Sequence, residues 1–125
     1  MSKSENPTHP AAATNLTDFE TAYVAKWLET HKRAALVYLL LTGLEDSPKW
    51  SGELTTYIDK ATEGAWTVDE RSLYRALRRL QNQGLVDHTR QQSEGPGASR
   101  KVYSITTSGT RIVQTLAATT KMYGP

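Results

Sequence analysis

The chain has 125 residues, a length that predicts a single domain with a core of ordinary size. Charged residues make up 22% of the sequence and hydrophobic residues 38%, which is typical of a folded globular protein. The absence of cysteine excludes disulfides, cysteine-based zinc sites and thiol chemistry. The longest purely apolar run, residues 34–41, is too short to cross a bilayer, and no secretion signal is expected at the N-terminus. We therefore expect a cytoplasmic protein with no membrane partner.

The net charge of +2 is distributed unevenly along the chain. Residues 17–70 contain ten acids and five bases, whereas residues 71–101 contain seven bases and two acids. A basic segment of this kind fits a surface that meets nucleic acid. Taken alone, it would fit equally well a basic face that serves only solubility.

The N-terminal region predicts a disordered tail followed by a helix. Residues 1–16 are rich in Ser, Thr, Asn, Ala and Pro and lack an apolar period. A capping box at Thr17 and Glu20 predicts that a helix starts there and covers residues 17–33. Along it the large aromatic side chains recur every four residues, at Phe19, Tyr23 and Trp27. This stripe either packs on its own subunit or contacts a second subunit, and we favour the second because large aromatics are enriched at interfaces.

The next segment predicts the centre of the core. Residues 34–41 are apolar on every side, as in a fully buried helix, and Gly43 and Pro48 end it. A second helix is then predicted to start with Ser51 as its cap and to end at Gly64. Its buried stripe is predicted to consist of Leu54, Ile58 and Ala61.

Three residues at the start of this second helix have open roles. Lys49 and Ser51 lie where backbone amides and the helix dipole favour a phosphate, although a capped surface helix would have the same residues. Trp50 is predicted to serve core or hinge packing.

The most informative stretch is residues 67–83, which predicts an amphipathic helix. Thr67 and Glu70 have capping-box spacing, and Gly84 suits the left-handed position after the last turn. One face carries the apolar residues Leu73, Leu77 and Leu80. The opposite face carries Arg71, Arg75, Arg78 and Asn82. A helix that buries one face and offers arginines on the other is suited to an anionic partner.

The segment that follows predicts a hairpin and a last helix. Residues 85–92 and 100–107 predict strands, joined by a turn at 94–99, and residues 108–123 predict a helix capped by Thr106 or Thr107. This order predicts a mainly α protein with a small β-hairpin wing. The fold is a winged helix-turn-helix core over residues 34–107, with additional N- and C-terminal helices in one domain over 17–125.

The pattern SLYRALRRLQNQGLV, followed by GPGASRKVYSITTSG, resembles the PadR family of bacterial transcriptional regulators. The resemblance covers roughly half the chain, and several parts of the family motif occur there in the same order. It implies a winged helix-turn-helix regulator that dimerises through its terminal helices. One position departs from the family pattern: many PadR-like proteins have proline directly after the tyrosine, whereas this chain has Arg75. The site preferences of the family are therefore not carried over.

The helix 67–83 and the wing 85–107 supply the predicted DNA contacts. Arg71 and Arg75 lie in the N-terminal half of the helix, which points deepest into the major groove, and are predicted to read bases. The predicted phosphate contacts are Ser72, Tyr74, Arg78, Arg79, Lys49, Ser51, Arg90, Arg100 and Lys101. The alternative for Tyr74 is packing against the wing, and the alternative for Arg79 is pairing with Asp69 or Glu70. The basic side chains of the wing could instead contact the minor groove or serve solubility alone.

A homodimer seam is predicted from the terminal helices. It combines the aromatic stripe with the apolar stripe of the last helix and comprises Phe19, Tyr23, Trp27, Ile112, Leu116 and Tyr123. The resemblance also implies a small aromatic effector at the interface, with Tyr23 and Trp27 as candidates to line its pocket; ordinary interface packing is the alternative.

Catalysis finds little support in the sequence. His9, His31 and His88 lack a second ligand at metal spacing and an adjacent nucleophile, so no cofactor, metal or catalytic residue is expected. The sequence predicts a sequence-specific regulator, a repressor that binds a pseudo-palindromic operator in double-stranded DNA as a homodimer. The alternative is an architectural, partition or interaction module of plasmid or phage type with weak sequence preference.

Overall fold

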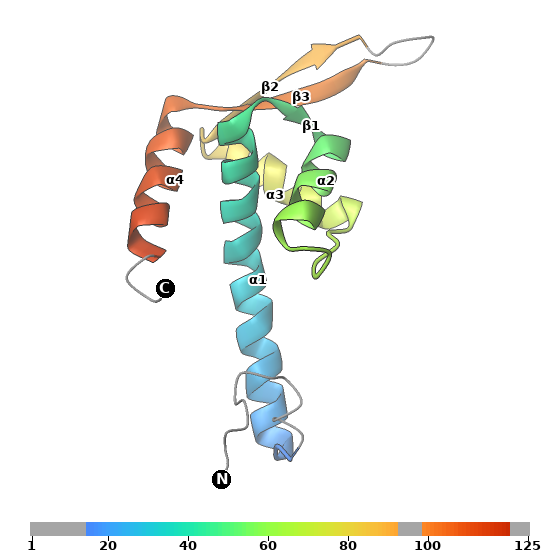
Figure 1. Cartoon of the computed structure of the whole chain (residues 1–125), viewed down its shortest axis with the longest axis vertical. Helices are drawn as coiled ribbons and strands as arrows, with labels where there is room; N and C mark the ends of the chain where they lie inside the picture. Colours follow the sequence, from blue (N-terminus) through green and yellow to red (C-terminus); the bar gives the residue numbers. More distant parts are fainter. Residues whose placement is uncertain (1–14, 93–98, 121–125) are drawn as a thin grey trace. The chain divides into compact units, whose positions relative to one another are not determined.

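The computed structural model describes residues 15–92 and 99–120, so most of the predicted tail and hairpin turn and Tyr123 lie outside the described residues. The elements run in the order α1 (Asp18–Asp46), β1 (Lys49–Trp50), α2 (Ser51–Ala61), α3 (Glu70–Asn82), β2 (Val86–Gln91), β3 (Arg100–Ile105) and α4 (Thr107–Thr120). Figure 1 shows a mostly helical chain with a small sheet, so the predicted fold class is confirmed. The chain divides into two units, Met1–Arg33 and Ala34–Pro125. No helix among the described residues is long and apolar enough to cross a membrane.

The first unit holds the beginning of α1, and its predicted cap is confirmed. The Thr17 amide donates to Glu20 Oε1 at 2.9 Å, and the Glu20 amide donates to Thr17 Oγ1 at 3.1 Å. The predicted boundary between two helices near residue 33 is wrong, because Asp18–Asp46 form one helix. Residues 29–35 contain neither glycine nor proline, and a change in apolar pattern does not by itself stop a helix.

The second unit has one apolar core, to which the second half of α1 and helix α3 contribute four residues each. Its buried residues come from every helix, from two of the strands and from the loop before α3. They are Leu36, Leu40, Leu41, Leu44, Leu54, Ile58, Val68, Leu73, Ala76, Leu77, Leu80, Val86, Tyr103 and Val113. The core positions predicted on α3, namely Leu73, Leu77 and Leu80, are each 1% exposed.

Helix α2 starts one residue earlier than predicted. Its N-cap is Trp50, whose amide donates to Glu53 Oε1 at 3.1 Å, and Ser51 is the first helical residue. At the other end Ala61 is exposed, because it is the last helical residue and projects beyond the core that buries Leu54 and Ile58. The predicted stripe is therefore one residue too long.

Helix α3 is capped by Asp69 and not by Thr67. The Ser72 amide donates to Asp69 Oδ2 at 3.2 Å, and Glu70 is the first helical residue. A carboxylate at this position also faces the positive end of the helix dipole, an advantage that a hydroxyl lacks. The predicted end is confirmed: Gly84 has φ of 77°, and the Leu85 amide donates to Leu80 O at 2.9 Å.

The sheet has three antiparallel strands in the order β1-β3-β2. The predicted hairpin is confirmed by pairs such as Arg90 with Lys101 in β2 and β3. Strand β1 was not predicted; it pairs Trp50 with Val102 on the other edge of β3. Two residues are too few for an alternating pattern to be recognised in a sequence.

Helix α4 is anchored beside the end of α3. Thr106 caps it by accepting from the Gly109 amide at 3.1 Å, and the same hydroxyl donates to Gly84 O at 2.8 Å. A methyl group at Gly109 would lie 2.3 Å from Leu85 O, so only glycine allows this close approach. The cap predicted at Thr106 or Thr107 is therefore Thr106.

Candidate nucleic-acid interface

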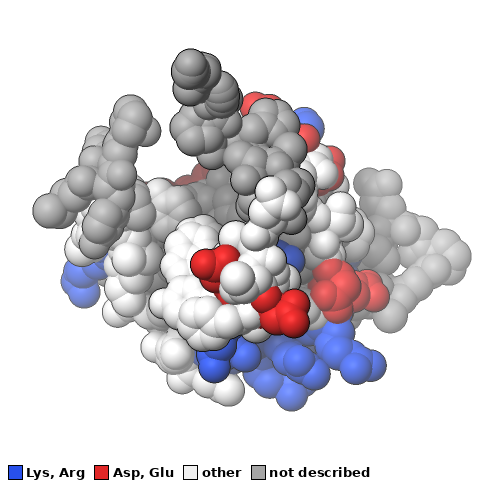
Figure 2. All heavy atoms as spheres, turned by 90° about the horizontal axis from the view of Figure 1, so that it is seen from below, with Lys and Arg blue, Asp and Glu red and all other residues white. Residues whose placement is uncertain are grey.

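The exposed face of α3 carries a dense group of positive charges. An open depression of about 590 Å³ runs along the helix and is lined by Glu70, Arg71, Tyr74, Arg75, Arg78, Arg79 and Asn82. The four arginines project outward while the leucines on the opposite face are buried. Figure 2 shows basic side chains gathered along one edge of the molecule. The structure therefore places the arginines of α3 on one face and its leucines on the opposite face, as the sequence predicts.

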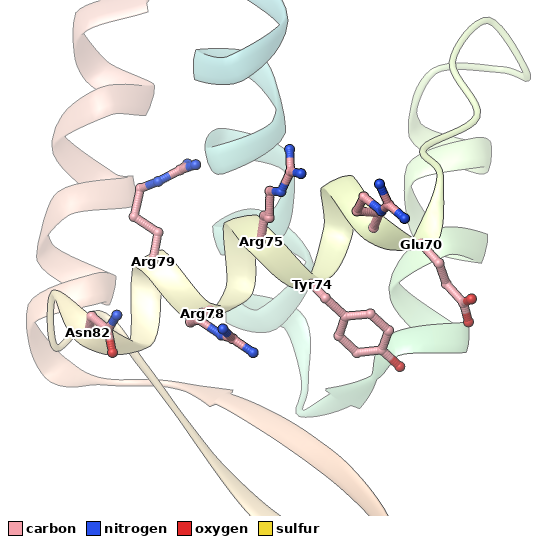
Figure 3. Close-up of a pocket in the computed structure, with 7 residues that line it drawn as sticks. Glu70, Tyr74, Arg75, Arg78, Arg79 and Asn82 are labelled. Atoms are coloured by element: carbon pink, nitrogen blue, oxygen red, sulfur yellow. The ribbon is translucent and has the colours of Figure 1, made fainter.

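The side chains on this face fan out to two flanks. Figure 3 shows Tyr74 and Arg78 on the flank near the sheet strands, and Arg75 and Arg79 on the other. Such a spread covers a wider strip than a single row of arginines would. It suits a partner whose negative charge lies on both sides of a groove.

Two polar contacts hold the sheet-side flank in place. Tyr74 OH lies 3.1 Å from Ser51 Oγ, which joins α3 to the first turn of α2. Gln81 Oε1 lies 2.8 Å from His88 Nδ1, which joins α3 to β2. The orientation of α3 relative to α2 and the wing is therefore fixed by side chains that border its exposed face.

Tyr103 lies under the same flank. The residue is 4% exposed, and burial raises the pKa of the Tyr103 phenol. The neighbouring Tyr74 raises that pKa further, whereas Arg78 and Arg90 lower it. The phenol therefore stays neutral at neutral pH, so it adds no negative charge to the basic surface.

The wing carries positive charge where β2 ends and β3 begins. Arg90 on β2 and Lys101 on β3 are directly opposite each other, and both are exposed. Like charges in this position destabilise a hairpin unless an anion lies between or beside them. Arg100 is also exposed, and its guanidinium lies 4.1 Å from the centre of the Trp50 ring.

Lys49 is engaged inside the protein. Its Nζ donates to Gly43 O at 2.7 Å and lies 3.2 Å from Asp46 Oδ2, so it covers the C-terminal end of α1. Its side chain is only 12% exposed. The structure therefore gives Lys49 a role in ending α1, and its predicted phosphate contact has no support in this placement.

Arg79 does not form the ion pair with Asp69 or Glu70 that was the alternative to a DNA contact. Within the described part of the chain no ion pair joins it to Asp69 or Glu70. Nine or ten residues of helix separate these positions by about 14–15 Å, which is too far for a direct pair. Nor does any cluster of His, Cys, Asp and Glu among the described residues suit a metal ion.

The predicted terminal stripes are exposed to different degrees. Phe19, Tyr23 and Trp27 are 73%, 64% and 57% exposed. On α4, Ile112 is 39% exposed and Leu116 is half-buried, while Tyr123 lies outside the described residues. Tyr23 and Trp27 line an open depression of about 280 Å³ together with Lys26 and Thr30.

The helix pair α2 and α3, followed by a hairpin and a basic outward face, defines a winged helix-turn-helix protein. The sequence profile of the transcriptional regulator PadR-like family matches residues 40–115. The chain belongs to this family, whose members are transcriptional regulators and not enzymes. No curated protein sequence matches the chain.

Solved structures agree with this fold. A PadR-like transcription factor from Bacteroides fragilis is 25% identical, with a TM-score of 0.66 over 78% of this chain and 91% of that one. A PadR family regulator from Eggerthella lenta is 24% identical, with a TM-score of 0.65 over 82% and 87%. Bacillus subtilis PadR, solved in complex with operator DNA, is 20% identical, with a TM-score of 0.60 over 66% of this chain and 47% of that one.

Proposed function

We propose that this protein is a DNA-binding transcriptional regulator that places α3 in the major groove and the wing on the flanking backbone. The observation that carries the proposal is the outward face of α3, where four arginines surround one open depression opposite a buried apolar face. Family membership and the operator complex of Bacillus subtilis PadR support it. A regulator of this kind acts in the cytoplasm, at the nucleoid.

The roles along the interface follow from position. Arg71 and Arg75 occupy the N-terminal half of α3 and are proposed to meet guanine edges, to which an arginine donates two hydrogen bonds. Arg78 and Arg79, on opposite flanks of α3, are proposed to contact the phosphates on the two sides of the groove. The remaining proposed backbone contacts are Ser51, Ser72, Tyr74, Arg90, Arg100 and Lys101.

We propose further that the protein acts as a homodimer. The exposed aromatic residues Phe19, Tyr23 and Trp27 and the exposed Ile112 supply apolar surface that a monomer leaves in water. Leu116 and Tyr123 complete the proposed seam, and residues 17–125 form the proposed domain. Two copies would read a pseudo-palindromic site with half-sites about one helical turn apart. Equilibrium sedimentation of Tyr23→Ser beside wild type tests the seam: a persistent dimer contradicts it.

We also propose that the protein binds a small aromatic effector. The depression at Tyr23 and Trp27 is open and has two aromatic walls. Tryptophan quenching by a panel of planar ligands tests it, with Trp27→Phe as the matched control. Quenching that is equal in the control would exclude this depression, because Trp50 and Trp66 would then report the binding.

Selection of binders from a randomised duplex pool at physiological salt tests the function. We expect enrichment of a two-fold symmetric site. Binding without enrichment would favour an architectural module with weak sequence preference, and no binding would contradict the proposal. Adding the protein to a promoter that carries the selected site should then lower transcription in vitro. Increased transcription would identify an activator instead of a repressor.

A further inference from the structure

A small cleft lies where the first turn of α2, helix α3 and the wing meet. Its volume is about 350 Å³, and its lining residues are Ser51, Tyr74, Arg90, Ser99, Arg100, Lys101 and Tyr103. Three of these side chains are cationic, the other four carry hydroxyl groups, and none is acidic. Every lining side chain can therefore donate a hydrogen bond, which is the requirement for binding a phosphate group.

One cation of the cleft is held in place by an aromatic ring. The Arg100 guanidinium lies 4.1 Å from the centre of the Trp50 ring, within the range of a cation–π contact. Trp50 belongs to the edge strand β1, and its partner on β3 is Val102, two residues beyond Arg100. A guanidinium over an aromatic ring has five N–H donors, and those that do not face the ring remain available to an anion.

A glycine allows the ring to reach this place. A methyl group on Gly52 would lie 2.3 Å from the outer edge of the Trp50 indole. The indole therefore lies directly over the backbone of the first turn of α2, and any larger residue at position 52 would displace it. Gly52 has no unusual φ angle, so the need for glycine comes from the ring and not from the backbone.

The opposite wall of the cleft is preorganised by a hydrogen bond between Ser51 and Tyr74. Ser51 Oγ and Tyr74 OH lie 3.1 Å apart, so one hydroxyl donates to the other and the pair shares one remaining proton. An oxygen of a bound phosphate can accept that proton. The two walls thus present a fixed hydroxyl pair and a fixed guanidinium to the same space.

We propose that this cleft binds a single phosphate of the DNA backbone and that Trp50 is the positioning residue that holds Arg100 toward it. The inference rests on the proposed function and deepens it, because a phosphate fixed at this cleft would set how far α3 advances along the groove. Arg100 contacts the phosphate, and Trp50 acts through Arg100. A small molecule that carries a phosphate group could bind the cleft through the same contacts, and competition with inorganic phosphate distinguishes it from DNA.

The experiment is a double-mutant cycle on duplex binding. We expect Arg100→Ala to weaken binding about tenfold and to lower the salt slope by about 0.9, the value for one phosphate contact. Trp50→Leu should weaken binding about two- to fivefold, the range of an exposed cation–π contact. The double variant should bind as the Arg100→Ala variant does. Additive losses would mean that Trp50 does not act through Arg100 and would overturn the proposal.

Two further variants separate positioning from folding. Trp50→Phe keeps an aromatic face and should recover most of the affinity that Trp50→Leu loses. Gly52→Ala keeps both Trp50 and Arg100 and favours the helix, yet it should weaken binding in the same way, because its methyl group displaces the indole. Thermal melting of each free protein checks the fold. Wild-type affinity in a folded Gly52→Ala variant would overturn the positioning role.

Single methylphosphonate substitutions in the duplex locate the contact. Neutralisation of several phosphates should weaken wild-type binding, and at one of them Arg100→Ala should lose no further affinity while Trp50→Leu should lose less than wild type. Inorganic phosphate should reduce duplex binding no more than chloride at equal ionic strength. Specific competition by inorganic phosphate would assign the cleft to a free ligand and overturn the DNA assignment. If wild type bound no duplex at all, the proposed function would fail together with this inference, whereas binding that ignores Trp50 and Arg100 would remove the inference alone.

Discussion

Replacing Arg75 with alanine should relax the base preference of this protein at one position of its site. Arg75 is exposed on the outward face of α3, in the N-terminal half of the helix, which we propose enters the groove first. A two-hydrogen-bond contact with guanine is worth about 1–3 kcal/mol of discrimination, which is roughly five- to 150-fold in affinity. Selection with the variant should therefore enrich a site in which one specified guanine has become degenerate.

Arg71 should contact a second base, and helix geometry predicts how far that base lies from the one that Arg75 contacts. It lies four residues before Arg75, which corresponds to about 6 Å along α3. Successive base pairs are about 3.4 Å apart, so the two arginines reach bases that are roughly two steps apart when α3 lies along the groove. Arg71→Ala should therefore relax a different position, about two base pairs from the one relaxed by Arg75→Ala.

Arg79→Ala is the matched control on the same helix. It removes the same charge about one turn further along the same flank, toward the C-terminal end of α3, where we expect a phosphate contact, and should weaken binding to all sequences while the preference stays intact. If Arg75→Ala and Arg79→Ala both left the preference unchanged, Arg75 would not read bases. Loss of preference at the same position in both variants would contradict the division between base-reading and phosphate-contacting arginines.

Three further results are expected. Lys101→Ala should weaken binding to specific and random duplexes alike and lower the salt slope by about 0.9; a loss confined to the specific site would contradict a phosphate contact. Thr106→Ala should lower the free energy of unfolding in urea by about 1–2 kcal/mol, because α4 loses its cap, whereas Thr106→Ser should lose less. Hydrogen bonds from Ser72 lower the pKa of Asp69, so its stabilising contribution is present at neutral pH and lost as the pH falls through the lowered pKa. Asp69→Asn should remove that part of the acid-induced loss of stability; an unchanged profile would contradict the role of the cap.

The sequence predicts the apolar framework well because periodicity records which face is buried. Leu73, Leu77 and Leu80 recur at helical spacing and are buried, and Gly84 has the left-handed conformation that its position after the helix requires. Helix starts are less certain, because several residues near the start can act as the cap. Asp69 replaces Thr67 at α3, and Trp50 precedes Ser51 at α2, since tertiary packing decides which candidate faces the free amides.

The sequence predicted which charged residues form the candidate site but not the contacts that position them. The arginines of α3 were found from the helical pattern, since their exposure depends only on position around the helix. The pairing of Ser51 with Tyr74 spans 23 residues, and the cation–π contact of Arg100 with Trp50 depends on a two-residue strand. No local pattern encodes either contact. For the same reason Lys49 was predicted to meet DNA, although its ammonium covers the end of α1.

Guanine N7 methylation on the selected duplex tests the central claim most directly, because dimethyl sulfate modifies guanine N7 in the major groove and adenine N3 in the minor groove. We predict that wild type protects guanines in each half-site and that Arg75→Ala exposes one of them again while the others stay protected. Protection confined to adenine N3, or a guanine pattern identical in wild type and Arg75→Ala, would contradict the placement of the arginine face of α3 in the major groove.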